Sequence, residues 1–186
     1  VDHERFAAPP LSPEQDPLIL SIGRIVDNKG PQLLVEAAKL LAAQGRTIKV
    51  GFLGDGPLRE RLALDVASAG LSDHVQFHGQ VRDVESWMKK AAIVVRPSYT
   101  EGLPLAVLEA MSAGRCNVVS DISPNRELIQ HDVNGLVFRT GDAADLAGQL
   151  SRAVSDEDLR VRLGAAAREA SLSRSWTRMA AETAEV

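Results

Sequence analysis

Residues 18–53 read LILSIGRIVDNKGPQLLVEAAKLLAAQGRTIKVGFL: a short apolar run, a glycine-containing loop, a helical stretch and a second apolar run. Apolar residues recur through 31–44 at the spacing of an amphipathic helix, and Pro31 stands in its first turn, where a missing amide is tolerated. Gly45 follows, as a helix-ending glycine would. A strand, a helix and a second strand in this order are typical of a βαβ unit.

The same alternation continues along the chain. We expect six strands, at 18–22, 48–53, 75–78, 92–95, 118–120 and 136–138. Helices are expected between them, at 31–44, 58–69, 84–90 and 105–113. From Ala143 onward the pattern is helical, with breaks near Ser155 and Ser173. The predicted fold is therefore α/β, a Rossmann-like parallel sheet with helices on both faces.

The chain divides into three expected segments. Residues 1–17 are rich in proline and acidic residues toward their end, which suits an extended linker. Residues 18–172 carry the alternating pattern and form the expected domain. Residues 173–186 are expected to form a further helix. No tandem repeat interrupts this organisation.

Composition excludes several classes of protein. With 45% hydrophobic and 25% charged residues, the chain of 186 residues is neither disordered nor collagen-like. Its 21 basic and 25 acidic residues give a net charge of −4, so we expect no nucleic-acid partner. Cys116 is the sole cysteine, which excludes an internal disulfide and favours a reducing compartment. No apolar run approaches the roughly 20 residues that span a bilayer, and we expect a cytoplasmic protein.

Four loops that follow strands are rich in glycine and charge: residues 23–30 (GRIVDNKG), 54–57 (GDGP), 78–83 (HGQVRD) and 96–104 (RPSYTEGLP). In an open parallel sheet, ligands bind outside the carboxyl ends of the strands, where the strand order reverses. The first loop does not match the P-loop pattern, and the second lacks the third glycine of a dinucleotide fingerprint. We expect the functional site among these four loops.

Two carboxylates flank the start of the helix expected at 105–113. Pro104 suits the first helical position, which places Glu101 outside the helix. Glu109 is the lone charge within this apolar stretch, and because an unpartnered buried carboxylate is costly, it is expected to face a polar cleft; a solvent-exposed edge of the helix is the alternative. Glu101 would lie roughly 12 Å away if the span were helical, too far for the carboxylate pair of a retaining hydrolase. We expect both to contact one elongated ligand, with the amides of Gly102 and Leu103 facing an anion between them.

Two cations, Arg24 and Lys29, share the first loop with Gly23 and Gly30. Facing a helix N-terminus, they would neutralise a diphosphate without a metal ion, although exposed, solvated side chains are the alternative. The four histidines have no spacing typical of metal ligands, and no metal site is expected.

Taken together, in order and spacing, the segments SIGRIVDNKG, FLGDGP, FHGQV, RPSYTEGLPLAVLEAMSAG, SDISPNRELI and NGLVF resemble a known domain. They resemble the C-terminal, donor-binding domain of the GT-B-fold group 1 glycosyltransferases, retaining enzymes that use nucleotide sugars. The resemblance covers residues 1 to about 176. It implies a UDP- or GDP-linked sugar as partner and an acceptor bound by an N-terminal domain that is missing from this chain, toward which the helix at 173–186 would return.

The resemblance also implies roles for single residues. Arg24 and Lys29 would grip the diphosphate and Glu101 would position the donor sugar, which makes these three the expected catalytic residues. Glu109 would hold the ribose hydroxyls, and the backbone around Val81 would meet the base. The complete set of implied donor-binding residues is Gly23, Gly54, Asp55, Gly56, Val81, Gly102, Leu103 and Glu109. No cofactor and no metal are implied.

The implied activity is that of a hexosyltransferase, moving a sugar with retention to an acceptor hydroxyl in polysaccharide, lipopolysaccharide or glycolipid synthesis. The isolated domain is expected to be inactive, and any peripheral membrane contact would be made by the missing domain. Three alternatives stay open: a non-catalytic nucleotide-sugar-binding module, a glycosyl phosphorylase on the same fold, and a receiver-like or NAD-binding domain.

Overall fold

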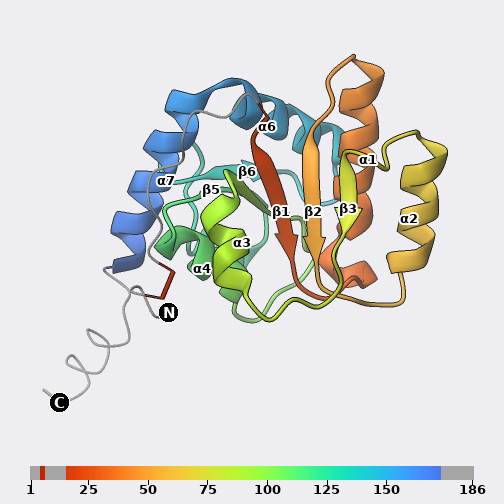
Figure 1. Cartoon of the computed structure of the whole chain (residues 1–186). Coiled ribbons are helices and arrows are strands. Elements are labelled where there is room, and N and C mark those ends of the chain that lie inside the picture. The colour runs from red at the N-terminus through yellow and green to blue at the C-terminus, as the bar shows by residue number, and fades with distance from the viewer. Residues whose placement is uncertain (1–4, 7–15, 173–186) are drawn as a thin grey trace, which may run out of the picture.

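Six strands form one sheet in the computed structural model of the chain, which describes residues 5–6 and 16–172 (Figure 1). The strands are β1 (Leu18–Ile22), β2 (Lys49–Leu53), β3 (Val75–Phe77), β4 (Ile93–Arg96), β5 (Cys116–Ser120) and β6 (Leu136–Phe138). Their order is β3-β2-β1-β4-β5-β6, and all five pairings are parallel. The strand order thus reverses between β1 and β4, and the predicted Rossmann-like parallel sheet is confirmed.

Helices connect the strands as the sequence predicts. They are η1 (Asp27–Lys29, a 3₁₀ turn), α1 (Pro31–Ala43), α2 (Arg59–Ser68), α3 (Val84–Lys90), α4 (Leu105–Ser112), α5 (Ser123–Arg126), α6 (Ala143–Ser155) and α7 (Glu157–Leu172). The expected helix boundaries are correct to within one residue, and the break near Ser155 is confirmed. Two short elements, η1 and α5, were not predicted. The break near Ser173, the helix at 173–186 and most of the linker at 1–17 lie outside the described residues.

Helix ends follow the signals in the sequence, with one difference. Pro31 is the first residue of α1, and Gly45, just beyond its end, has the positive φ of 76° expected of a helix-ending glycine. Pro104, expected at the first helical position, instead precedes α4 as its N-cap. This shift of one residue leaves Glu101 outside the helix, as predicted.

Side chains of the strands alternate between two helical layers. Ile19 and Ile93 pack with α1, α2 and α6, whereas Leu20 and Val94 point to the opposite face and pack with α3 and α4. On that second face α7 packs against α4 (Figure 1). Phe6, only 5% exposed, belongs to the same layer. Helices therefore cover both faces, as predicted.

Two further observations concern the reactivity of Cys116 and the possibility of a membrane-spanning helix. Cys116 is buried at the start of β5, and burial raises the pKa of its thiol to about 12, so it packs as a small buried hydrophobic side chain. No helix within the described residues is long and apolar enough to cross a membrane.

Candidate functional site

Three loops meet at the carboxyl ends of β1, β2 and β4, the ends toward which the arrowheads of β1 and β2 point in Figure 1. The loop at 23–30 lies in the middle. On one side the Ile25 amide donates to the Asp55 carbonyl at 2.9 Å, and on the other the Tyr99 amide donates to the Asn28 carbonyl at 2.9 Å. The meeting point is where the strand order reverses, the place at which open α/β sheets bind ligands.

Two glycines allow these loops to approach each other. At Gly54, where φ is +142°, an added Cβ would lie 1.9 Å from the Gly23 carbonyl oxygen. At Gly30, where φ is +65°, it would lie 2.0 Å from the Pro97 carbonyl oxygen. Both positions combine a backbone conformation that favours glycine with a contact that leaves no room for a side chain.

The carboxylate of Glu101 lies where these loops converge. Its Oε1 accepts hydrogen bonds from Arg96 Nε at 2.5 Å and from Ser98 Oγ at 2.6 Å. Its Oε2 accepts a hydrogen bond from Lys29 Nζ at 2.7 Å. The Glu101 side chain is only 4% exposed. A buried carboxylate held by two cations and a hydroxyl has one fixed orientation.

These contacts also determine the charge of Glu101. Burial alone would raise the pKa of its carboxyl, but the hydrogen bonds from Arg96, Lys29 and Ser98 outweigh burial and hold the pKa below its ordinary value. Glu101 is therefore ionised at neutral pH. Lys29 remains 21% exposed, so it can contact both this carboxylate and a ligand outside it.

Arg96 and Ser98 are site residues that the sequence analysis missed. Arg96 Nη1 donates to the Ile22 carbonyl at 2.6 Å, and a Cβ at Gly23 would lie 2.6 Å from the same nitrogen. Arg96 thereby ties the end of β1 to Glu101. Arg96 could have been suspected from its position at the carboxyl end of β4. Its contact with β1 could not, because that contact depends on the pairing of β4 with β1.

The other predicted residues differ in their surroundings. Arg24 is exposed, and its side chain makes no hydrogen bond or ion pair with the described residues. Asp55 is exposed; its Oδ1 accepts from the Gly56 amide at 2.8 Å. Gly102 and Leu103 are exposed next to Glu101, Leu103 by 58%.

Val81 and Glu109 lie outside the hydrogen-bonded group around Glu101. Val81 is half-buried and packs with the layer that contains Phe6. Glu109 is half-buried on α4; burial raises the pKa of its carboxyl, nearby Arg5 lowers it, and nearby Glu85 raises it. The surroundings of the two carboxylates thus shift their pKa values in opposite directions.

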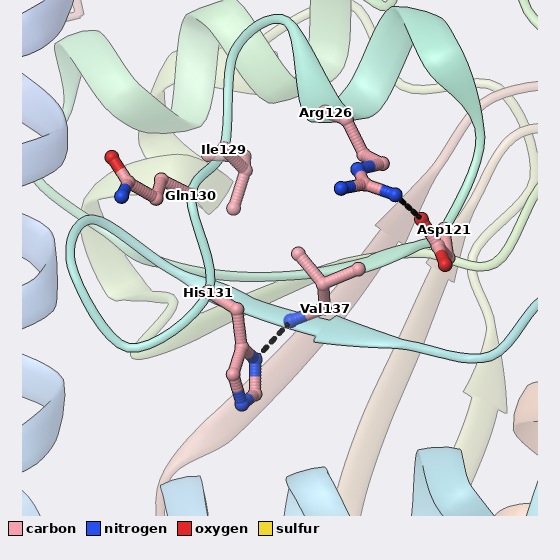
Figure 2. A pocket seen from close by; sticks show the side chains of 6 residues that line it. All are labelled: Asp121, Arg126, Ile129, Gln130, His131 and Val137. Carbon is pink, nitrogen blue, oxygen red and sulfur yellow. Dashed lines mark hydrogen bonds and ion pairs between the residues drawn. The ribbon is translucent and has the colours of Figure 1, made fainter.

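A separate hollow of about 510 Å³ lies beside β6 and α5 (Figure 2). Its polar lining includes Gln130 and two bonded pairs: Arg126 donates to Asp121 at 3.1 Å, and the Val137 amide donates to His131 Nδ1 at 3.0 Å. The sequence did not indicate this hollow. Among the described residues, no group of three or more His, Cys, Asp or Glu side chains is placed to hold a metal ion.

Comparison with known proteins identifies the family. Residues 2–170 match the sequence profile described as "Glycosyl transferases group 1". The chain belongs to this family. This group 1 domain is 33% identical over 178 residues to the D-inositol 3-phosphate glycosyltransferase of Xylanimonas cellulosilytica, covering 94% of the chain and 42% of that protein. Family membership removes the receiver-like and NAD-binding alternatives.

Solved structures agree on the fold and on the type of domain. The C-terminal domain of the group 1 glycosyl transferase LpcC from Francisella tularensis matches with a TM-score of 0.83 at 25% identity, covering 94% of this chain and 97% of that one. Anabaena HepE in complex with UDP-glucose matches with a TM-score of 0.84 at 19% identity, covering 100% of this chain and 56% of that one. The group 1 domain is thus of the C-terminal type of the GT-B fold. It spans 35% to 45% of the length of the curated relatives it matches.

Proposed function

We propose that this domain binds the nucleotide-sugar donor of a glycosyltransferase at the loops around Glu101. One observation carries the proposal. The buried, ionised carboxylate of Glu101 accepts hydrogen bonds from both Lys29 and Arg96 at the point where the strand order reverses. Family membership and the UDP-glucose complex of HepE, which has the same fold, support this placement. A UDP-linked hexose is the donor we propose, with GDP as the alternative nucleotide.

The proposed chemistry follows from where charge develops. As the sugar leaves its nucleotide, negative charge grows on the departing diphosphate, and fixed cations stabilise that transition state. Lys29, held by Glu101, and Arg24, whose guanidinium makes no hydrogen bond or ion pair with another described residue, are the cations proposed for this role. Glu101 would position the sugar, and Gly102 and Leu103 would offer exposed amides to it. The proposed transfer retains the anomeric configuration and needs no metal.

Glu109 is proposed to hold the ribose. A carboxylate accepts hydrogen bonds from two vicinal hydroxyls at once, and within the described residues no hydrogen bond already occupies this one. Burial raises the pKa of the Glu109 carboxyl, because the carboxylate loses water that would solvate its charge. Hydrogen bonds from the ribose hydroxyls would take the place of that water and favour the charged form. Gly54, Asp55, Gly56 and the Val81 backbone are proposed to line the rest of the donor site.

The acceptor is proposed to bind to an N-terminal domain, so that this chain alone binds donor without turnover. Acceptors in polysaccharide, lipopolysaccharide or glycolipid synthesis fit this proposal, with a cytoplasmic location and peripheral membrane contact through the other domain. An assay of sugar transfer by the chain, with and without an added acceptor domain, tests whether donor and acceptor bind to separate domains.

Thermal unfolding of the chain with UDP, GDP or ADP, each with and without EDTA, tests the donor site. A ligand at 100 times its dissociation constant adds about 2.7 kcal/mol of stability and should raise the midpoint by roughly 5–10 °C. We expect one nucleotide to do so, unaffected by EDTA. If no nucleotide shifts the midpoint while inorganic phosphate does, the donor site is refuted in favour of a phosphorylase.

Two substitutions separate the proposed parts of the site. Lys29→Ala should weaken both UDP and inorganic pyrophosphate by about 1.5–3 kcal/mol, the range for hydrogen bonds to charged groups. Glu109→Ala should weaken UDP and leave pyrophosphate unchanged, because pyrophosphate has no ribose. Calorimetric titration measures all four affinities. Equal losses for both ligands in Glu109→Ala would contradict the ribose assignment, and an unchanged affinity in Lys29→Ala would remove Lys29 from the site.

A further inference from the structure

A row of buried polar side chains runs from α5 to Glu101. Asn125 Nδ2 donates to both the carbonyl and the hydroxyl oxygen of Ser120 at 3.1 Å. The Ser120 hydroxyl donates to the Ser98 carbonyl at 2.5 Å. The Ser98 hydroxyl in turn donates to Glu101 Oε1 at 2.6 Å. Ser98, Ser120 and Asn125 are all 0% exposed.

Stability alone does not account for this row. A fully buried polar group contributes little net stability when bonded and costs about 1–3 kcal/mol when it is left without a partner. Asn125 Oδ1 is such an atom, since it is buried and accepts no hydrogen bond from the described residues. Buried polar groups of this kind are retained in some proteins because they specify one arrangement.

The arrangement that these bonds specify is that of the loop carrying Glu101. The ladder between β4 and β5 ends at the pair Arg96 and Val119, so Ser98 lies beyond the last paired residue of β4. The Ser120 hydroxyl holds the Ser98 backbone at this point. Because a hydroxyl is a single rotating donor, its bond to Glu101 requires a fixed backbone.

We propose that Ser120 and Asn125 are positioning residues of the donor site, which fix Ser98 so that its hydroxyl orients the Glu101 carboxylate toward the donor sugar. The role toward the donor sugar rests on the proposed function. The orientation of the Glu101 carboxylate by Ser98 does not depend on any ligand. Two experiments therefore address the two parts separately.

The first experiment needs no ligand. In the full 186-residue chain, the Glu101 carboxyl is titrated by carbon-detected NMR in the parent protein, Ser120→Ala and Asn125→Leu. Arg96 and Lys29, the charged groups that face Glu101, stay in place in both variants. We expect the pKa of Glu101 to rise toward its ordinary value, because the Ser98 hydrogen bond is one of three that hold it down.

Asn117 provides the matched control. It is also 0% exposed, and its Nδ2 donates to the Arg115 carbonyl at 3.0 Å, at the other end of β5. Asn117→Ala should lower the unfolding midpoint without changing the titration of Glu101. An unchanged titration in Ser120→Ala, or an equal shift in Asn117→Ala, would overturn the inference.

The second experiment compares UDP-glucose with UDP in calorimetric titrations of the same variants. Since Glu101 is proposed to meet the sugar, Ser120→Ala should reduce the preference for UDP-glucose over UDP by about threefold to tenfold, the range of one hydrogen bond. In a Ser98→Ala background the same substitution should change nothing further. The positioning role is refuted if Ser120→Ala leaves the preference for UDP-glucose over UDP undiminished. It is also refuted if Ser120→Ala reduces that preference by the same factor in the Ser98→Ala background as in the parent chain. If the parent chain binds neither ligand, the proposed function fails, while the titration of Glu101 still tests the orientation of its carboxylate by Ser98.

Discussion

Replacing Glu101 with alanine is expected to destabilise the domain by about 3–5 kcal/mol, the usual cost of removing one partner from a buried ion pair. The substitution leaves Arg96, whose side chain is only 11% exposed, and Lys29 without their shared carboxylate. Urea unfolding at pH 7 measures the loss. Binding of UDP-glucose should fall as well, because Lys29 loses the group that orients it.

An exposed ion pair on the neighbouring loop serves as the control. Asp121 pairs with Arg126 at 3.1 Å, but both side chains are exposed, by 41% and 67%. Asp121→Ala should therefore cost less than about 1 kcal/mol. Similar losses for Glu101→Ala and Asp121→Ala would contradict the structural role of Glu101.

The pH dependence of this effect has a defined sign. Because folding lowers the pKa of Glu101 from its ordinary value of 4.5, its stabilisation is present above that pH and is lost as the pH falls through the folded pKa. Glu109, whose pKa is raised, has the opposite sign. The difference in stability between the parent chain and Glu101→Gln should thus shrink on acidification; a constant difference would contradict the lowered pKa.

Gly54→Ala is expected to cost about 2–5 kcal/mol and to abolish nucleotide binding. The added methyl would lie 1.9 Å from the Gly23 carbonyl oxygen, so the loops after β1 and β2 must separate. The φ of +142° adds backbone strain, because side chains rarely adopt it. Thermal unfolding and UDP titration measure the two effects.

Gly45→Ala is the matched control for this substitution. Gly45 also has a positive φ, of 76°, but nothing lies within 4 Å of an added Cβ. It should show backbone strain alone, about 1–2 kcal/mol, and unchanged nucleotide binding. If Gly54→Ala behaves like Gly45→Ala, the close approach of the two loops does not matter for the site.

Helices and strands were predictable from the sequence where a pattern of apolar residues within a short segment indicates them. The periodicity of apolar residues within residues 31–44 reports which face of one helix is buried, and it placed α1 to within one residue. The short helix α5 has too few residues to show a period and was missed. Pro104 was misplaced by one position because a proline suits several positions near a helix start.

The candidate site divides in the same way. Glu101 and Lys29 stood out as charges in glycine-rich loops, whereas Arg96 and Ser98 did not, although they lie in one of the same loops. Nothing in the local sequence separates a solvated arginine from one that bonds the end of another strand. That distinction depends on which strand lies next to β4.

The sequence by itself determined the α/β class, the position of nearly every strand and helix, and the loops in which function is to be sought, because these follow from burial patterns within a few neighbouring residues. Only the tertiary structure decided the strand order β3-β2-β1-β4-β5-β6. That order brings Lys29 to within 2.7 Å of Glu101, 72 positions away, and places Arg96 against β1. Such contacts result from the packing of the whole sheet between its two helical layers, which no local pattern records.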